Sequence, residues 1–310
     1  MPEFYLIPKR LARRAPVLVT IARWLEAMVF RVIFWLVRKL SLNSAMRVSG
    51  AAFQLVGPHS DKAKKARANL EIAFPERSME WREATVRQIF RHVGYSAVEL
   101  IKLEQIWEDR EERIEFVLEP AALEHMKSRR ATVFMTAHVG AWQVASLVTR
   151  HYGFNFATLY APESNPTMQE LMLGLRKSFG ERLIAADAGP RPLIKELNAG
   201  HSLIMATDTR PDTGKLIPFF GRDALTNTSA AGLALRTGAA LVLARAERLP
   251  TQRYRITVYD PLISPNPEAP IKEQAVALTE LVHGFFEDWI EEYPEQWICL
   301  KRRWPKAHKL

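Results

Sequence analysis

A histidine stands where an apolar run of strand length ends, in the middle of the chain. Residues 131–137 are apolar and β-branched. His138 follows them directly, before Gly140 and a second apolar stretch at 144–148 with the character of a helix. This order predicts that His138 lies at the carboxyl end of a strand, the edge at which open α/β sheets bind ligands. A neutral imidazole with a pKa of about 6.5 could act there as a general base. Isolated histidines at strand ends also serve as structural residues.

A carboxylate occupies the same kind of position further along the chain. Asp208 follows the apolar run 201–207. If the two runs form neighbouring strands, Asp208 could reach the crevice that holds His138 and orient its ring, as the acid of a catalytic triad does. A helix cap or an ion pair with Arg210 would explain the same aspartate equally well.

Alternating apolar runs and helical patterns place these two residues in an α/β fold. The strands are expected at 131–137, 154–160, 201–207, 239–246 and 254–260, and helices begin near 141, 167, 190 and 228. This order predicts a mixed, mainly parallel sheet flanked by helices. The part before the sheet, 43–128, reads as helical, and residues 271–292 have the spacing of an amphipathic helix that packs across the core.

The N-terminal part contains a long apolar segment, 17–39, that charged residues interrupt. Thr20 and four charged residues, Arg23, Glu26, Arg31 and Arg38, fall on one side of a helix, and the rest of its surface is mainly Trp, Phe, Leu, Ile and Val. The segment is therefore expected to lie in a membrane surface, or to cross the membrane with its polar stripe packed on protein. A buried helix of the domain is the alternative. We expect residues 1–42 to form a membrane-associated helix and residues 43–310 the catalytic domain.

Composition limits the classes of partner and site. The 310 residues are 48% hydrophobic and carry a formal net charge of +9, which indicates an anionic partner. Cys299 is the single cysteine, so an internal disulfide is excluded, and no Cys/His cluster has zinc-site spacing. No metal site is expected. The chain is basic overall, but it has no motif of interleaved aromatic and basic residues, so nucleic acid is not an expected partner.

The His138 block resembles a known family. Residues 138–143 are similar to the H-x-G-N-W-E block of the bacterial lipid A late acyltransferases, part of the lysophospholipid acyltransferase superfamily, whose signature is His, four residues, then Asp or Glu. Six further blocks fall in the family's order, at 67–70 with 74–76, 160–162 with 165–166, 207–211, 218–221, 239–245, and 293–297 leading to 302–304. Seven blocks in order cover nearly the whole chain.

The resemblance implies an acyltransferase with an acyltransferase-like fold. It would move a fatty acyl chain from an acyl carrier protein or coenzyme A thioester, as co-substrate rather than cofactor, to a hydroxyl of a lipid A-type glycolipid precursor. The location implied is the cytoplasmic face of the bacterial inner membrane. A lysophospholipid or an aminolipid is the alternative acceptor. His138 would be the base, and the expected substrate-binding residues are Arg176, Trp142, Gly140, Arg210, Phe219 and Phe220.

Two further groups of residues are candidates for binding. Residues 226–229 open a predicted helix and could meet an anion or an oxyanion, although helix capping explains them equally well. Arg302, Arg303 and Lys306 could attract an acidic carrier protein or an anionic membrane.

The chain departs from the family pattern at Gln143, which stands where the motif has an acid. An amide oxygen can hold the His138 ring but offers it no negative charge. By analogy with the acid-to-amide change in a triad, this loss could cost up to about 10⁴-fold in turnover. The position could be an engineered change, or the chain a natural member with reduced or specialised activity. It could also be a lipid-binding member without catalysis, or Asp208 could orient His138 instead.

Overall fold

The computed structural model describes residues 16–160, 162, 165–177 and 182–305. The helices of eight residues or more are α2 (Pro16–Lys39), α3 (Leu42–Val56), α4 (Asp61–Ala73), α5 (Met79–Ile101), α8 (Pro120–Ser128), α10 (Pro166–Lys177), α11 (Pro190–Asn198), α12 (Ser229–Thr237) and α13 (Ile271–Glu292). The shorter helices are η1 (Gly57–His59), α6 (Leu103–Glu108), α7 (Arg110–Arg113), η2 (Val144–Ser146), α9 (Leu147–His151), η3 (Pro250–Gln252) and η4 (Pro294–Gln296). The strands are β1 (Ile114–Leu118), β2 (Thr132–Thr136), β3 (Phe156–Tyr160), β4 (Arg182–Ala185), β5 (Ser202–Ala206), β6 (Lys215–Phe219), β7 (Arg222–Thr226), β8 (Ala240–Leu249) and β9 (Arg253–Val258).

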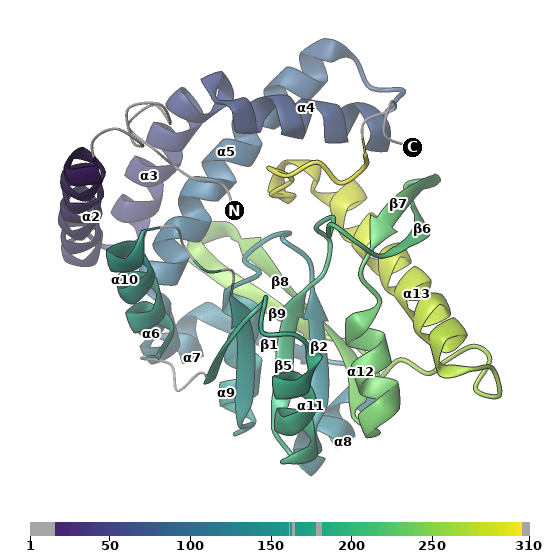
Figure 1. Cartoon of the computed structure of the whole chain (residues 1–310). Coiled ribbons are helices and arrows are strands. Elements are labelled where there is room, and N and C mark those ends of the chain that lie inside the picture. The colour runs from purple at the N-terminus through teal and green to yellow at the C-terminus, as the bar shows by residue number, and fades with distance from the viewer. Residues whose placement is uncertain (1–15, 161, 163–164, 178–181, 306–310) are drawn as a thin grey trace.

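Seven of the strands form one mixed, mainly parallel sheet in the order β1-β9-β8-β2-β5-β3-β4 (Figure 1). Each neighbouring pair is parallel except β8 and β9. β6 and β7 form a separate antiparallel hairpin. The predicted fold class is therefore confirmed as an α/β sheet flanked by helices.

Strand β2 lies at the centre of the sheet, and its side chains alternate between two cores. Val133 and Met135 pack in a core with residues of α11, α12 and α13, whereas Phe134 packs on the opposite face with residues of α8 and α9. All five residues of β2 are buried because helices cover both faces. The end of this strand is therefore a rigid place from which to present a side chain.

The five predicted strands are confirmed as β2, β3, β5, β8 and β9, with ends shifted by a few residues. Four short strands were not predicted: β1, β4, β6 and β7. β1 lies in the region that reads as helical, and its partner β9 follows about 140 positions later, at Ile114↔Tyr254. A local pattern does not reveal such a distant partner.

The predicted helices are confirmed with one difference. α10, α11, α12 and α13 begin at residues 166, 190, 229 and 271, close to the expected positions. The segment after His138 is instead a turn, followed by η2 and the short helix α9. The turn matters because it brings residues 139–143 around the histidine.

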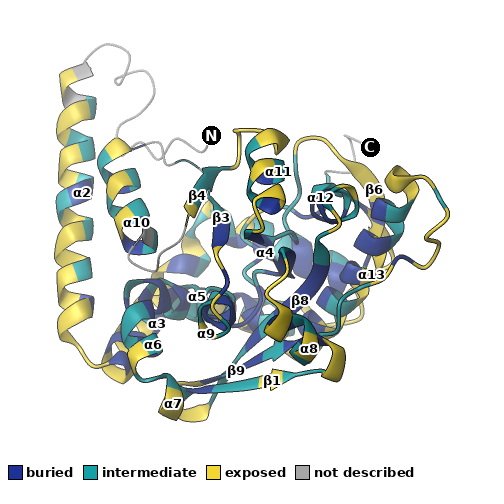
Figure 2. Ribbon diagram, turned by 90° about the horizontal axis from the view of Figure 1, so that it is seen from below, coloured by how far each residue is buried: buried dark blue, intermediate teal, exposed yellow. Residues whose placement is uncertain are grey.

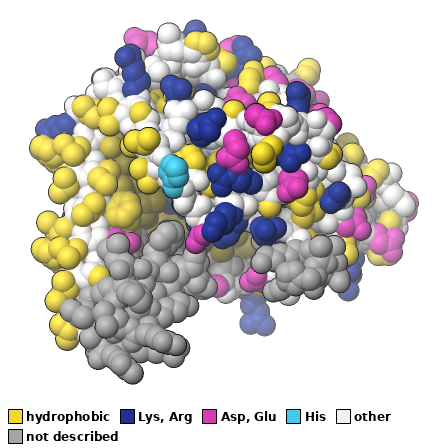
Figure 3. Space-filling model, turned by 90° about the horizontal axis from the view of Figure 1, so that it is seen from above, with side chains coloured by type: hydrophobic (Ala, Val, Ile, Leu, Met, Phe, Trp, Pro, Cys, Tyr) yellow, Lys and Arg dark blue, Asp and Glu magenta, His cyan; other side chains and the backbone are white. Residues whose placement is uncertain are grey.

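Helix α2 carries much of its apolar surface on the outside of the molecule (Figure 2). Its inward side is anchored by Asn165, whose amide donates to the Arg23 carbonyl at 3.0 Å and to the Glu26 carboxylate at 2.8 Å. The exposed large apolar residues of α2 are Val17, Ile21, Trp24, Leu25, Val29, Val32, Ile33, Trp35 and Leu36. Figure 3 shows hydrophobic side chains gathered along this edge.

Along the part of the chain that the structure describes, no helix has a stretch long and apolar enough to cross a membrane. Membrane association of α2 and the division at residue 42 stay predictions.

Candidate active site

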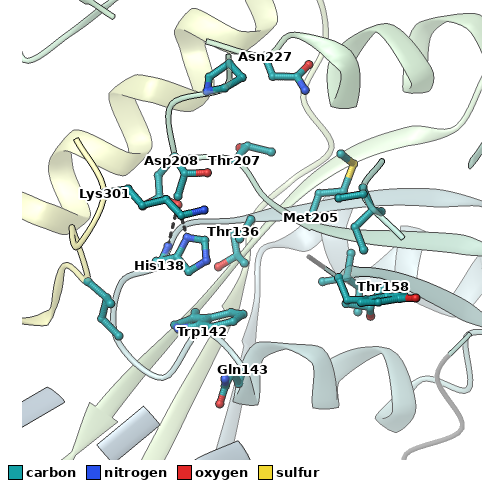
Figure 4. Close-up of a pocket in the computed structure, with 18 of the residues that line it drawn as sticks. Thr136, His138, Trp142, Gln143, Thr158, Met205, Thr207, Asp208, Asn227 and Lys301 are labelled. Carbon is teal, nitrogen blue, oxygen red and sulfur yellow. Dashed lines mark hydrogen bonds and ion pairs between the residues drawn. The ribbon is translucent and has the colours of Figure 1, made fainter. Parts of the chain in front are cut away.

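His138 and Asp208 meet at the carboxyl edge of the sheet. Strands β2 and β5 pair in register, Thr136 opposite Ala206, and the Thr207 amide donates to the Thr136 carbonyl at 3.2 Å. Two residues beyond each strand end, the His138 ring Nδ1 lies 2.6 Å from Asp208 Oδ1 (Figure 4). The His138 backbone amide donates to the same oxygen at 3.0 Å. The parallel register thus produces the predicted meeting of the two residues.

The Asp208 carboxylate is buried and fully engaged. Its second oxygen, Oδ2, accepts a hydrogen bond from the Trp297 indole at 3.2 Å. Burial alone would raise the pKa of this carboxyl, but the charge and hydrogen bonds of His138, together with Trp297, outweigh burial and hold the pKa below its ordinary value. The carboxylate is therefore ionised at neutral pH.

An ionised carboxylate only accepts hydrogen bonds, so the proton of the neutral His138 ring lies on Nδ1. The other nitrogen, Nε2, is then unprotonated, and it forms no hydrogen bond with any described residue. The His138 side chain is 25% exposed and lines a cavity. The ring is thus set up to accept a proton from a molecule in that cavity.

Gln143 does not hold the His138 ring. Its side-chain oxygen is buried without a hydrogen-bond partner in the described structure, and in Figure 4 the side chain points away from His138, beyond Trp142. The Trp142 ring lies beside His138, with centroids 4.7 Å apart. Asp208 and Gln143 are the two candidates to accept a hydrogen bond from the His138 ring, and the geometry favours Asp208. Gln143 and Trp142 both line the cavity.

Gly140 has a structural reason to be glycine. Its φ is +62°, and a Cβ at this position would lie 2.3 Å from the Ala246 carbonyl oxygen. Gly140 is not among the residues that line the cavity. It allows the turn after His138 to pass against β8, where the Ala141 amide donates to the same carbonyl at 2.8 Å. The prediction of Gly140 as a substrate-binding residue is not supported by this placement.

The cavity beside His138 has a volume of about 810 Å³, within the range of ligand-binding pockets. Its apolar lining includes Leu100, Leu103, Leu193, Ile204 and Leu233. Its basic lining residues are Lys62, Arg176, Lys301 and Arg303, and of the described lining residues only Asp208 is acidic. The cavity is thus lined by apolar side chains together with several basic ones.

Besides Gly140, three predicted substrate-binding residues lie outside this lining. Arg210 does not line the cavity, and no ion pair joins it to Asp208 among the described residues. Phe219 is fully buried, with its ring centroid 5.7 Å from that of Trp304, and Phe220 stacks on Trp297 at 6.2 Å. The prediction that the two phenylalanines bind substrate is not supported by this placement, because both rings pack against Trp297.

Arg303 is buried, so the prediction that its side chain attracts an acidic carrier protein or an anionic membrane is wrong. Its guanidinium donates to the Leu225 carbonyl at 2.8 Å, the Thr226 hydroxyl at 2.6 Å and His283 Nε2 at 3.1 Å. Burial lowers the pKa of Arg303 to about 10. His283 Nδ1 donates to the Pro218 carbonyl at 2.7 Å, and burial lowers the pKa of His283 to about 4. Lys306 lies outside the described residues.

The loop at 226–229 leads into α12 beside the cavity. Asn227 Oδ1 accepts from the amide of Ser229, the first residue of the helix, at 2.8 Å, whereas the N-cap residue Thr228 makes no side-chain capping hydrogen bond. Asn227 and Ser229 also line the cavity.

The C-terminal segment builds one wall of the site, a role that the sequence did not indicate. The Ile298 amide donates to the His138 carbonyl at 2.8 Å. The buried Asn69 amide donates to the carbonyls of Cys299 at 2.9 Å and Lys301 at 2.7 Å. Cys299 is itself buried, and burial raises its thiol pKa to about 12. The sequence did contain one sign of this contact, because residues 67–70 and 293–297 both belong to blocks that resemble the family.

Among the described residues, no three His, Cys, Asp or Glu side chains gather as metal ligands would.

The chain is similar to known proteins that are named as lipid A biosynthesis acyltransferases. The lipid A biosynthesis lauroyltransferase of Escherichia coli K12 is 29% identical over 250 residues, 78% of each chain. The lipid A biosynthesis myristoyltransferase of the same organism is 23% identical over 160 residues, so this chain spans about half (50%) of that relative. The crystal structure of the 1-acyl-sn-glycerophosphate acyltransferase PlsC from Thermotoga maritima is 14% identical, with a TM-score of 0.38, and covers 92% of this chain and 100% of that one. The model of the bacterial lipid A biosynthesis acyltransferases matches residues 10–306, and the chain therefore belongs to that family.

Proposed function

We propose that this protein transfers a fatty acyl chain from a thioester donor to a hydroxyl of a lipid A-type glycolipid precursor. The observation that carries the proposal is the His138–Asp208 pair, 2.6 Å apart, with the free ring nitrogen at an apolar cavity of about 810 Å³. Family membership supports the lipid A-type acceptor. The donor in this proposal is an acyl carrier protein or coenzyme A thioester.

The reaction follows from the protonation state of the pair. The acceptor hydroxyl approaches Nε2 of His138, which takes its proton as the oxygen attacks the thioester carbonyl. Asp208 stabilises the imidazolium that forms, because its buried carboxylate keeps its charge. The tetrahedral intermediate then collapses, the C–S bond breaks, and the leaving thiolate takes the proton back from Nε2. The ester product and the free thiol balance the reaction.

The cavity residues are assigned to the substrates by their chemistry. The apolar side chains and the Trp142 ring beside His138 suit an alkyl chain. Arg176, on α10, lines the cavity and suits an anionic group of the donor arm or of the acceptor. Arg210 does not line this cavity, so it could bind a substrate only at a part of the substrate that lies outside the cavity.

The exposed apolar face of α2 supports binding at a membrane surface, which in this proposal is the cytoplasmic face of a bacterial inner membrane. Trp24 and Trp35 are 58% and 60% exposed, which is unusual for tryptophan on a surface that meets only water. A helix that lies at the interface would bury this face in lipid. The amphiphilic acceptor would then reach the cavity from the membrane.

The test is transfer of a labelled acyl group to a lipid A precursor by the purified protein in lipid vesicles. We expect transfer by the wild type and a fall of roughly 10⁴-fold in kcat for Asp208→Asn, which keeps the shape of the residue but removes its charge. Lysophospholipid and aminolipid acceptors in the same assay identify the acceptor class. Absence of transfer to every lipid acceptor, or full activity of Asp208→Asn, would contradict the proposal.

A further inference from the structure

Two lysines from distant parts of the chain line the cavity that His138 opens onto. Lys62 lies in the first turn of α4 and Lys301 in the segment after η4. In Figure 4 the Lys301 side chain reaches across the His138–Asp208 pair toward the cavity. Its amino group forms no hydrogen bond or ion pair with any described residue, and its side chain is exposed at the rim.

The position of Lys301 is fixed by a buried side chain of the same helix that carries Lys62. Asn69 Nδ2 donates to the Lys301 carbonyl at 2.7 Å, and Asn69 Oδ1 accepts from the Arg303 amide at 2.9 Å. Asn69 thus clamps the backbone on both sides of residue 302 onto α4. The Asn69 side chain therefore fixes the segment that carries Lys301 on the helix that carries Lys62, although 239 positions separate the two lysines in the chain.

The charges of the two lysines act on each other. Burial lowers the pKa of Lys62, and the charges of Lys65 and Lys301 lower it further. Among the described lining residues the only carboxylate is Asp208, which is already engaged by His138 and Trp297. Two ammonium groups that line the same cavity favour the binding of an anion there.

We propose that Lys301 and Lys62 bind a phosphate group of a substrate at the rim of the cavity, next to His138. Two ammonium groups can each donate to phosphate oxygens, and the bound phosphate would fix the position of the reacting groups relative to Nε2. A phosphate ester occurs on a phosphorylated sugar acceptor and also on the phosphopantetheine arm of a thioester donor. That the phosphate belongs to a substrate rests on the proposed acyl transfer, whereas the anion site itself does not.

Binding of a simple amphiphile tests the anion site without catalysis. Decyl phosphate and decyl glucoside have the same alkyl chain and differ in charge. Their binding can be followed by the fluorescence of Trp142 and Trp297, which line the cavity. We expect Lys301→Met and Lys62→Met each to weaken decyl phosphate roughly tenfold or more and to leave decyl glucoside unchanged. Lys301→Arg should retain most of the affinity for decyl phosphate.

The matched control is Lys64→Met on the same helix. Lys64 pairs with Asp61 at 2.8 Å, and both side chains are largely exposed, at 75% and 87%. This variant changes the net charge equally but should bind both amphiphiles like the wild type. If Lys64→Met weakens decyl phosphate as much as Lys301→Met, or if the rim variants weaken both amphiphiles alike, the site is overturned.

Kinetics then identify the source of the phosphate. If Lys301→Met raises KM for a phosphorylated acceptor but not for the same acceptor without phosphate, the acceptor supplies the group. If it raises KM for the donor alone, the phosphopantetheine arm supplies it. A fall in kcat with both KM values unchanged would overturn the assignment to a substrate. Specific decyl phosphate binding without any acyl transfer would refute the proposed function and leave the anion site standing.

Discussion

His138 and His283 both donate a hydrogen bond through Nδ1, yet their surroundings differ in the two features that decide chemistry. At His138 the acceptor is the Asp208 carboxylate, and Nε2 faces the cavity. At His283 the acceptor is the neutral Pro218 carbonyl, and the Arg303 guanidinium occupies Nε2. A ring with a counter-charge and an open nitrogen can take up a proton, whereas a ring beside a buried cation stays neutral.

The largest expected difference between the two regions is in turnover. His138→Gln should lower kcat by roughly 10⁴-fold, because the amide cannot accept the hydroxyl proton. His283→Gln should change kcat only a few-fold, since an amide can still donate to Pro218 and accept from Arg303. Steady-state kinetics at saturating substrate measure both values, with equilibrium unfolding as the control for folding. Equal losses in the two variants would remove the distinction between the histidines.

The acid stability of the protein should depend on His283. Its pKa is about 4 in the folded protein and about 6.5 in the unfolded chain, so the unfolded chain binds more protons between these values. Stability contributed by the neutral ring is complete above pH 6.5 and is lost as the pH falls toward 4. The unfolding free energy of the wild type should fall by about 3 kcal/mol more than that of His283→Gln over this range. Parallel curves for the two proteins would contradict the neutral His283.

Removing the His283 ring altogether should affect stability rather than chemistry. His283→Ala leaves one N–H of the buried Arg303 guanidinium and the Pro218 carbonyl without their partner, so we expect the unfolding free energy to fall by about 2 kcal/mol. The kcat of the folded fraction should stay within about threefold of the wild type. Urea unfolding and kinetics at low temperature separate the two effects. A loss of kcat without loss of stability would place His283 in the catalytic machinery.

The smallest effect is expected at the motif position. Gln143→Glu should change kcat by less than about threefold, because residue 143 does not contact His138 and Asp208 already supplies the charge. Burying a carboxylate oxygen without a donor should cost roughly 1 kcal/mol of stability. Initial rates and urea unfolding measure the two quantities. A rise in activity by orders of magnitude would show that glutamine impairs the enzyme.

Local patterns in the sequence predicted the parts of the site that lie on regular elements. The apolar runs before His138 and Asp208 placed both residues at strand ends, and parallel pairing brought them together. The spacing of apolar residues likewise predicted α13 with its observed bounds, Ile271–Glu292. Period and position sufficed here because each element has apolar residues at regular spacing that pack in the core.

The same patterns failed where the outcome depends on contacts between distant segments. Phe219 and Phe220 have the composition of a pocket wall, but the tryptophans of the C-terminal segment cover them. Arg303 has the composition of a surface cation, but the turn around Asn69 carries it inside. Gln143 occupies the acid's place in the motif, yet the turn at Gly140 directs it away from His138. Such contacts join residues that the local sequence does not relate.

The burial of Cys299 gives this protein a built-in reporter for the opening of its C-terminal wall. A thiol that is buried, with its pKa raised to about 12, reacts with a maleimide only when the segment around it leaves α4. No other cysteine in the 310 residues competes for the reagent. The labelling rate therefore measures how often the segment that carries Lys301 detaches, and a ligand that engages that lysine should slow the reaction.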